Sequence, residues 1–88
     1  MGFTANAMDW AAENGHLELV KWLHLNKPEA CTTDAMDSAA AFGRLEVVKW
    51  LHFNRTEGCT NNAVRWASVY GHLEVVEWLK QNIPMFKD

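Results

Sequence analysis

Two pairs of histidine and cysteine are the residues of this chain best suited to metal chemistry. His24 lies seven residues before Cys31, and His52 lies seven residues before Cys59. Imidazole nitrogen and thiolate sulfur are common zinc ligands, so the two pairs could supply four ligands. The corresponding third pair is missing, because Lys80 replaces the histidine and the chain has no third cysteine. We therefore predict no metal site and no other cofactor.

The chain also lacks the residue arrangements that are typical of catalysis. No serine or cysteine has a base and an orienting partner at a plausible spacing, and paired carboxylates such as Glu13 and Glu18 are expected on different helices. No glycine-rich loop that could bind phosphate is present. We expect no enzymatic activity.

The histidines and cysteines recur because the whole chain is repeated. Residues 15–23 return as residues 43–51 and again as residues 71–79, each copy 28 residues after the previous one. A fixed period between about 20 and 50 residues is typical of arrays whose units bury their apolar faces against one another. We assign one domain, residues 1–88, which contains three repeats at residues 3–30, 31–58 and 59–86.

Charge, hydropathy and cysteine spacing limit the partners and the compartment. A net charge of −3 offers no basic surface for a nucleic acid, and the apolar runs are far shorter than the ~20 residues that cross a bilayer. Cys31 and Cys59 occupy the same position in successive repeats, one stacking step of about 8–10 Å apart, which is too far for a disulfide. We predict no nucleic-acid or membrane partner and a cytoplasmic or nuclear location.

Each repeat is expected to begin with a short helix that packs closely against its copies. An Asn or Asp serves as the N-cap, alanines spaced four residues apart allow another helix to approach, and a left-handed glycine ends the helix. In chain order these residues are Asn6, Ala7, Ala11 and Gly15, then Asp34, Ala35, Ala39 and Gly43, then Asn62, Ala63, Ala67 and Gly71.

A second helix with a broad apolar stripe is expected after the glycine. Leu17, Val20 and Leu23 and their equivalents are spaced three residues apart, and Trp22 widens the stripe. Each such helix is expected to end at an asparagine in the left-handed conformation, namely Asn26, Asn54 and Asn82.

Residues 35–51 follow the sequence Ala-Met-Asp-Ser-Ala-Ala-Ala-Phe-Gly-Arg-Leu-Glu-Val-Val-Lys-Trp-Leu. This sequence resembles the helical core of an ankyrin repeat, whose pattern includes Ala-Ala, two variable residues, Gly-His and Glu-Val-Val, and the resemblance covers all three repeats. Short repeats of this kind are similar to those in large arrays from oomycetes and giant viruses. The resemblance implies an all-α, right-handed helix-turn-helix solenoid of three ankyrin-like repeats. A tetratricopeptide-like array is the alternative fold.

The chain departs from the ankyrin pattern in two ways. Residues 34–37 replace the family's Thr-Pro-Leu-His, and the repeat has 28 residues where about 33 are usual. The missing residues fall between repeats, where an ankyrin repeat projects a β-turn finger. We therefore expect short inter-repeat loops and no binding through fingers.

Positions inside the first helix that differ among the copies predict a contact surface. Scaffold residues pack against the equivalent residues of the neighbouring repeats and therefore keep the same residue type. Residues that point outward are free to vary. In ankyrin proteins the corresponding positions line the concave recognition surface, and aromatic residues are favoured interface anchors. The alternative is that the aromatic residues fill gaps between repeats. The nine predicted partner-binding residues are Trp10, Glu13, Asn14, Ser38, Ala41, Phe42, Trp66, Val69 and Tyr70.

Two other repeated sets are predicted to be structural. One tryptophan recurs in every copy, which favours framework packing over a stacking platform for bases or sugars. A histidine or arginine follows each turn glycine, where the family's turn histidine hydrogen-bonds the backbone. The two sets are Trp22, Trp50 and Trp78, and His16, Arg44 and His72.

These observations predict a protein–protein interaction module that presents a rigid concave surface to another protein of unknown identity. The alternative is a structural or self-assembling element, or a fragment of a longer array with no independent binding role. The third repeat is more polar than the second, as expected of a cap, because Arg65, Glu77, Lys80 and Gln81 replace Asp37, Lys49, His52 and Phe53. The first repeat shows no such change, so self-association is predicted through it.

Overall fold

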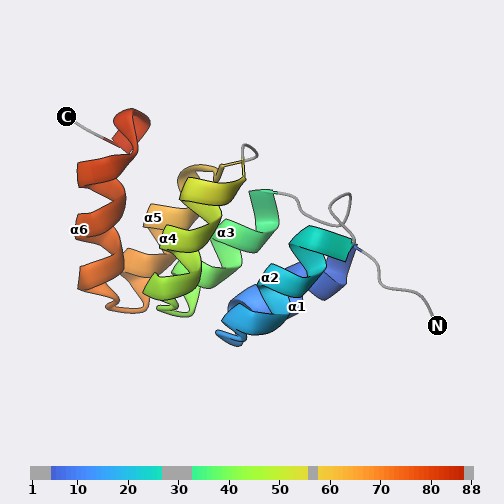
Figure 1. The fold of residues 1–88 in the computed structure, drawn as a ribbon. Helices are drawn as coiled ribbons and strands as arrows, with labels where there is room; N and C mark the ends of the chain where they lie inside the picture. Colours follow the sequence, from blue (N-terminus) through green and yellow to red (C-terminus); the bar gives the residue numbers. More distant parts are fainter. Residues whose placement is uncertain (1–4, 27–32, 56–57, 87–88) are drawn as a thin grey trace.

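Six α-helices follow one another in a computed structural model that describes residues 5–26, 33–55 and 58–86. They form three antiparallel pairs stacked side by side, with extents of 42 × 22 × 18 Å (Figure 1). No strand occurs in these residues, so the predicted all-α solenoid of helix-turn-helix units is confirmed. The helices are α1 (Ala5–Glu13), α2 (Leu17–Asn26), α3 (Thr33–Ala41), α4 (Leu45–Asn54), α5 (Asn61–Val69) and α6 (Leu73–Asn82), followed by the short 3-10 helix η2 (Pro84–Phe86).

A glycine in the left-handed conformation closes the turn inside each pair, as predicted. The φ angles are +73° at Gly15, +74° at Gly43 and +78° at Gly71. In the first pair, the N–H of Gly15 donates to the carbonyl of Ala12 at 3.1 Å, and the N–H of His16 donates to the carbonyl of Ala11 at 2.9 Å. This pair of bonds is the Schellman motif, and both other turns repeat it. The local turn chemistry therefore fixes where each second helix begins.

The predicted N-caps are wrong by two residues. Asn6, Asp34 and Asn62 are each the second residue of a helix instead of the residue before it. In α5 the cap is Thr60, whose extended backbone lets its hydroxyl accept the N–H of Asn62 at 3.1 Å. The threonine hydroxyl reaches the free N–H groups first, which leaves the asparagine inside the helix.

The asparagines that end the second helices also differ from the prediction. Every described residue with a positive φ is a glycine, so Asn26, Asn54 and Asn82 are not left-handed. Each instead donates its side-chain amide to the carbonyl of the tryptophan four residues earlier, at 2.9, 2.8 and 2.9 Å. The side-chain amide thus folds back onto the last turn of the helix. The chain then leaves in extended conformation at Arg55 and Ile83.

Burial of the alanines at three positions of the first helices depends on which neighbouring pair is present. The alanines equivalent to Ala11 are fully buried in all three pairs. Ala7 is only half-buried, although its equivalents are fully buried, so this position is covered by the preceding pair. Ala12 and Ala40 are fully buried whereas their equivalent Ser68 is exposed, so this position is covered by the following pair.

The first helices consequently lie closer to one another than the second helices do. Val20, Leu23, Val48 and Leu51 fill the space between the two layers and are almost completely buried. The second helices α2, α4 and α6, whose buried residues are larger, approach one another less closely than α1, α3 and α5 do. The structure thus has a distinct first-helix layer and second-helix layer.

Candidate functional site

The nine predicted partner-binding residues lie in the last turns of α1, α3 and α5 or directly after them. Because α1 packs on α3 and α3 packs on α5, these positions belong to one continuous layer. The aromatic members Trp10, Phe42, Trp66 and Tyr70 are 41% to 58% exposed. Asn14 and Val69 are also exposed, and the other three are half-buried, namely Glu13, Ser38 and Ala41. The aromatic residues are therefore partly exposed at the surface of this layer.

The exposed rings contact neighbours within their own repeat. Trp66 and Tyr70 are stacked, with ring centroids 5.8 Å apart and an angle of 22° between the planes. The ring of Trp10 lies 5.1 Å from that of His16. Such pairs hold large side chains in defined positions, which reduces the entropy lost if the rings are later covered.

The chemistry of this surface changes along the array. In the first repeat it presents the carboxylate of Glu13 and the amide of Asn14, which donates to the carbonyl of Trp10 at 2.8 Å. In the third repeat the same two positions are Val69 and Tyr70, both exposed. At these two positions the surface changes from polar in the first repeat to largely apolar in the third.

The histidines considered above as zinc ligands have a structural partner. His24 lies edge-on to Trp50 with ring centroids 5.1 Å apart, and His52 lies edge-on to Trp78 at 5.3 Å. Each histidine therefore packs against the tryptophan of the following repeat. Within the described residues, no group of three or more His, Cys, Asp or Glu side chains could hold a metal ion. Cys31, one of the four ligands considered, lies outside those residues.

Asp37 is a residue whose role sequence reasoning missed. Its two carboxylate oxygens accept hydrogen bonds from the next repeat, one from the N–H of Thr60 at 2.8 Å and one from its hydroxyl at 2.6 Å. Asp37 is 8% exposed, and this burial raises the pKa of its carboxyl, although both bonds from Thr60 act in the opposite direction. One feature of the sequence could have identified this role: Asp37 stands at the position of the histidine in the family's Thr-Pro-Leu-His.

The thiol of Cys59, which lies near Asp37, is unreactive. Burial, with a smaller contribution from the nearby Asp37, raises the pKa of Cys59 to about 11. A thiol with such a pKa stays protonated at neutral pH and is a poor nucleophile. It gives no support for cysteine-based catalysis.

In the second and third repeats, the side chain that follows the turn glycine contacts the preceding repeat. Arg44 donates its Nε to the carbonyl of Glu13 at 2.9 Å, which is the backbone hydrogen bond predicted for this position. His72 lies against the turn of the second repeat, because a Cβ added at Gly43 would be 2.6 Å from the His72 Nδ1. Two recesses of about 340 and 350 Å³ lie between successive turns, and both include Gly43 and Leu45. Arg44 and His72 therefore contribute to the contacts between successive repeats.

Comparison with known proteins gives one result on the family. A family model described as ankyrin repeats in many copies matches residues 8–52 and, in a second overlapping match, residues 36–79. The two matches together span most of the chain. No curated protein and no solved structure matches the chain. Separately, none of the described helices is long and apolar enough to span a membrane.

Proposed function

Because the chain belongs to the ankyrin repeat family, we propose that it is a protein–protein interaction module whose recognition surface is the first-helix layer. Ankyrin repeats are generally modules of this kind. The nine residues named above are the proposed contacts, and the exposed aromatic members are the proposed anchors. One observation carries the proposal: large rings are exposed on a layer whose helices are fixed by fully buried alanines. A surface that is rigid before binding loses little conformational entropy on binding.

Alanine substitution tests the recognition surface. Trp10→Ala, Phe42→Ala and Tyr70→Ala should each weaken capture of a partner that the unchanged chain retains, because an anchor residue contributes about 2 kcal/mol or more. The matched controls are Leu25→Ala and Phe53→Ala, which remove exposed apolar side chains from the second-helix layer. Partner binding that survives all three substitutions, in variants whose circular dichroism shows intact helices, would remove the proposal.

A second proposal is that the chain is a structural array element that associates through its first repeat. Trp22 is 45% exposed there, whereas Trp50 and Trp78 are half-buried beneath a histidine of the preceding repeat. Self-association is one form of this proposal. Sedimentation velocity over a range of concentrations measures it, and a strict monomer at high concentration would contradict self-association.

Ankyrin repeat proteins are typically not enzymes, and we propose neither an enzymatic activity nor a cofactor for this chain. We also propose that residues 1–88 form one domain of three repeats and that the protein works in the cytoplasm or nucleus. The protonated thiol of Cys59 is compatible with a reducing compartment.

A further inference from the structure

The turn of the first repeat contains a residue pair that occurs nowhere else in the chain. Asn14 is followed by Gly15, whereas each of the other six of the seven asparagines is followed by a residue with a side chain. The equivalent residues of the second and third turns are Phe42 and Tyr70. An asparagine before a glycine is prone to deamidation, because no side chain hinders the peptide nitrogen that attacks the asparagine amide.

Deamidation at this pair needs no reactant other than water. The backbone nitrogen of Gly15 loses its proton to hydroxide and attacks the side-chain carbonyl carbon of Asn14. A carbon–nitrogen bond forms, the bond from that carbon to the side-chain nitrogen breaks, and this nitrogen takes up a proton and leaves as ammonia. Water then opens the resulting succinimide ring at either carbonyl, which gives aspartate or isoaspartate.

In the folded turn, hydrogen bonds hold both reacting groups. The N–H of Gly15 donates to the carbonyl of Ala12 at 3.1 Å, and the side-chain amide of Asn14 donates to the carbonyl of Trp10 at 2.8 Å. Asn14 is exposed, so water can reach its side chain. The Gly15 nitrogen has to lose the proton that it donates to Ala12, which requires this bond to break. Deamidation of the folded chain therefore needs the turn to open first.

The second repeat covers this turn with the side chain of Arg44. Its Nε donates to the carbonyl of Glu13 at 2.9 Å, and its Cδ lies 3.0 Å from the position of a Cβ added at Gly15. The arginine side chain thus lies against the residues on both sides of Asn14. Opening of the turn has to displace Arg44 or break its bond to Glu13, and either adds to the free energy of opening.

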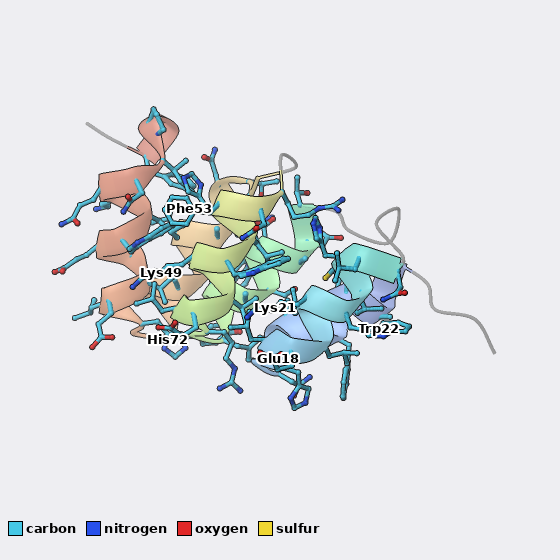
Figure 2. The ribbon with its side chains drawn as sticks, in the orientation of Figure 1. Glu18, Lys21, Trp22, Lys49, Phe53 and His72 are labelled. Atoms are coloured by element: carbon cyan, nitrogen blue, oxygen red, sulfur yellow. The ribbon has the colours of Figure 1, made fainter. Side chains whose placement is uncertain are left out.

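The other two turns differ in what covers them. His72 of the third repeat lies against the second turn, as Figure 2 shows, with its Nδ1 2.6 Å from the position of a Cβ added at Gly43. At the third turn, no described atom beyond the chain neighbours of Gly71 lies within 4 Å of such a Cβ. A turn is therefore covered where another repeat follows it, and the Asn14–Gly15 pair lies in a covered turn.

We propose that Asn14 is a latent deamidation site, which the second repeat protects through Arg44. When the turn opens and reacts, a carboxylate replaces the amide beside Glu13, at the negative end of the α1 dipole. A carboxylate cannot donate to the carbonyl of Trp10, so the modified turn loses that bond. Asn14 belongs to the proposed recognition surface, but the inference concerns the chemistry of the turn and does not depend on a partner.

Peptide mapping by mass spectrometry, after incubation of the whole chain in mildly alkaline buffer, tests this inference. Asn14 should convert to aspartate and isoaspartate faster than the other asparagines. Its conversion should be at least ~10-fold slower in native buffer than in concentrated guanidinium chloride, which corresponds to an opening free energy of about 1.4 kcal/mol. Arg44→Ala should raise the rate in native buffer and leave the rate in denaturant unchanged.

Two further variants separate opening of the first turn from unfolding of the whole chain. His72→Ala is the matched control, because it uncovers the second turn and should leave the Asn14 rate unchanged. Tyr70→Asn adds an asparagine before Gly71, in the turn that no repeat covers. In native buffer this residue should convert faster than Asn14, and adding Arg44→Ala should leave its rate unchanged while raising that of Asn14.

Three results would overturn the inference. Asn14 could convert equally fast in native buffer and in denaturant, which would mean that the turn gives no protection. Arg44→Ala could leave the Asn14 rate unchanged or lower it, or His72→Ala could raise that rate as much, and either outcome would remove the role of Arg44. Finally, the asparagine of Tyr70→Asn could convert no faster than Asn14, which would mean that cover by a following repeat does not set the rate.

Discussion

The layer of first helices and the layer of second helices pack by different means, although each is repeated three times. In the first-helix layer, buried alanines such as Ala39 allow the helices to lie close together, and the large aromatic side chains are partly exposed. In the second-helix layer, large side chains such as Leu51 are buried and the helices approach one another less closely. Within the first-helix layer, the alanines equivalent to Ala11 are alike in every repeat and fully buried, whereas the varying aromatic residues such as Trp10 and Phe42 are exposed.

Because the two layers pack differently, different kinds of substitution should destabilise them. A layer held together by small side chains is disturbed by adding volume, whereas a layer built on large side chains is disturbed by removing it. The expected effects on stability therefore depend on which layer is changed and whether a neighbouring repeat covers the position.

Removing volume from the second-helix side should have the largest effect. Leu51→Ala should lower the free energy of unfolding by about 2–5 kcal/mol, because a side chain that is 2% exposed would leave a cavity. Phe53→Ala, at a position 72% exposed, should change it by no more than about 0.5 kcal/mol. Urea denaturation followed by circular dichroism measures both. Equal losses would mean that the second-helix layer has no distinct core.

Adding volume to the first-helix layer should have the next largest effect. Ala40→Leu should cost about 1–3 kcal/mol, because Ala40 is fully buried beneath the following repeat. Ser68→Leu makes the equivalent change in the third repeat, where the position is exposed, and should stay within about 0.5 kcal/mol. The same urea titration compares them. A large cost at Ser68 would show that this position is not at an open end.

Loss of the Asp37 carboxylate, which bonds to the next repeat, should have the third largest effect on the free energy of unfolding. Asp37→Ala removes both acceptors of the Thr60 hydrogen bonds and should cost about 1–3 kcal/mol. Asp37→Asn keeps one acceptor and should recover part of the loss. Arg65→Ala, the matched change in the third repeat, should be close to neutral. If Asp37→Ala were as harmless as Arg65→Ala, the bonds to Thr60 would contribute nothing to the junction.

The pH dependence of Asp37 gives the smallest effect. Burial raises the folded-state pKa of this carboxyl above the ordinary 3.8, so its contribution to stability is fully present below pH 3.8 and is lost as pH rises through the folded-state pKa. The unfolding free energy of the wild type minus that of Asp37→Asn should therefore fall as pH increases from below 3.8 and then level off. Urea titrations at several pH values measure this difference. A difference that rises with pH would mean that the Thr60 bonds outweigh burial.

Local signals in the sequence predicted most of the fold. The turn glycines were predictable because a left-handed residue after a short helix favours glycine whatever lies around it. The N-caps were misplaced because the repeat offers two capping residues, such as Thr60 and Asn62, and propensity alone does not choose between them. The terminal asparagines were misassigned because an asparagine can end a helix in a left-handed conformation or with its side-chain amide bonded to a carbonyl four residues earlier, and residue type alone does not choose between them.

The candidate site was only partly predictable. Variation among copies identified positions such as Trp10 and Phe42, but whether a ring is covered depends on how closely the repeats pack. The hydrogen bond between Asp37 and Thr60 joins residues 23 positions apart in different repeats, so no local sequence pattern predicts it. The contacts from His24 to Trp50 and from His52 to Trp78 were missed for the same reason.

The claim that repetition marks the scaffold and variation marks the surface is tested most directly by one urea denaturation measurement. The triple variant Trp10→Ala, Phe42→Ala, Tyr70→Ala removes three large side chains from varying positions, and each is more than half exposed. We predict a cooperative transition and a loss of unfolding free energy smaller than that caused by Leu51→Ala alone. A larger loss, or an unfolded triple variant, would show that the varying aromatic residues belong to the core and would contradict the account.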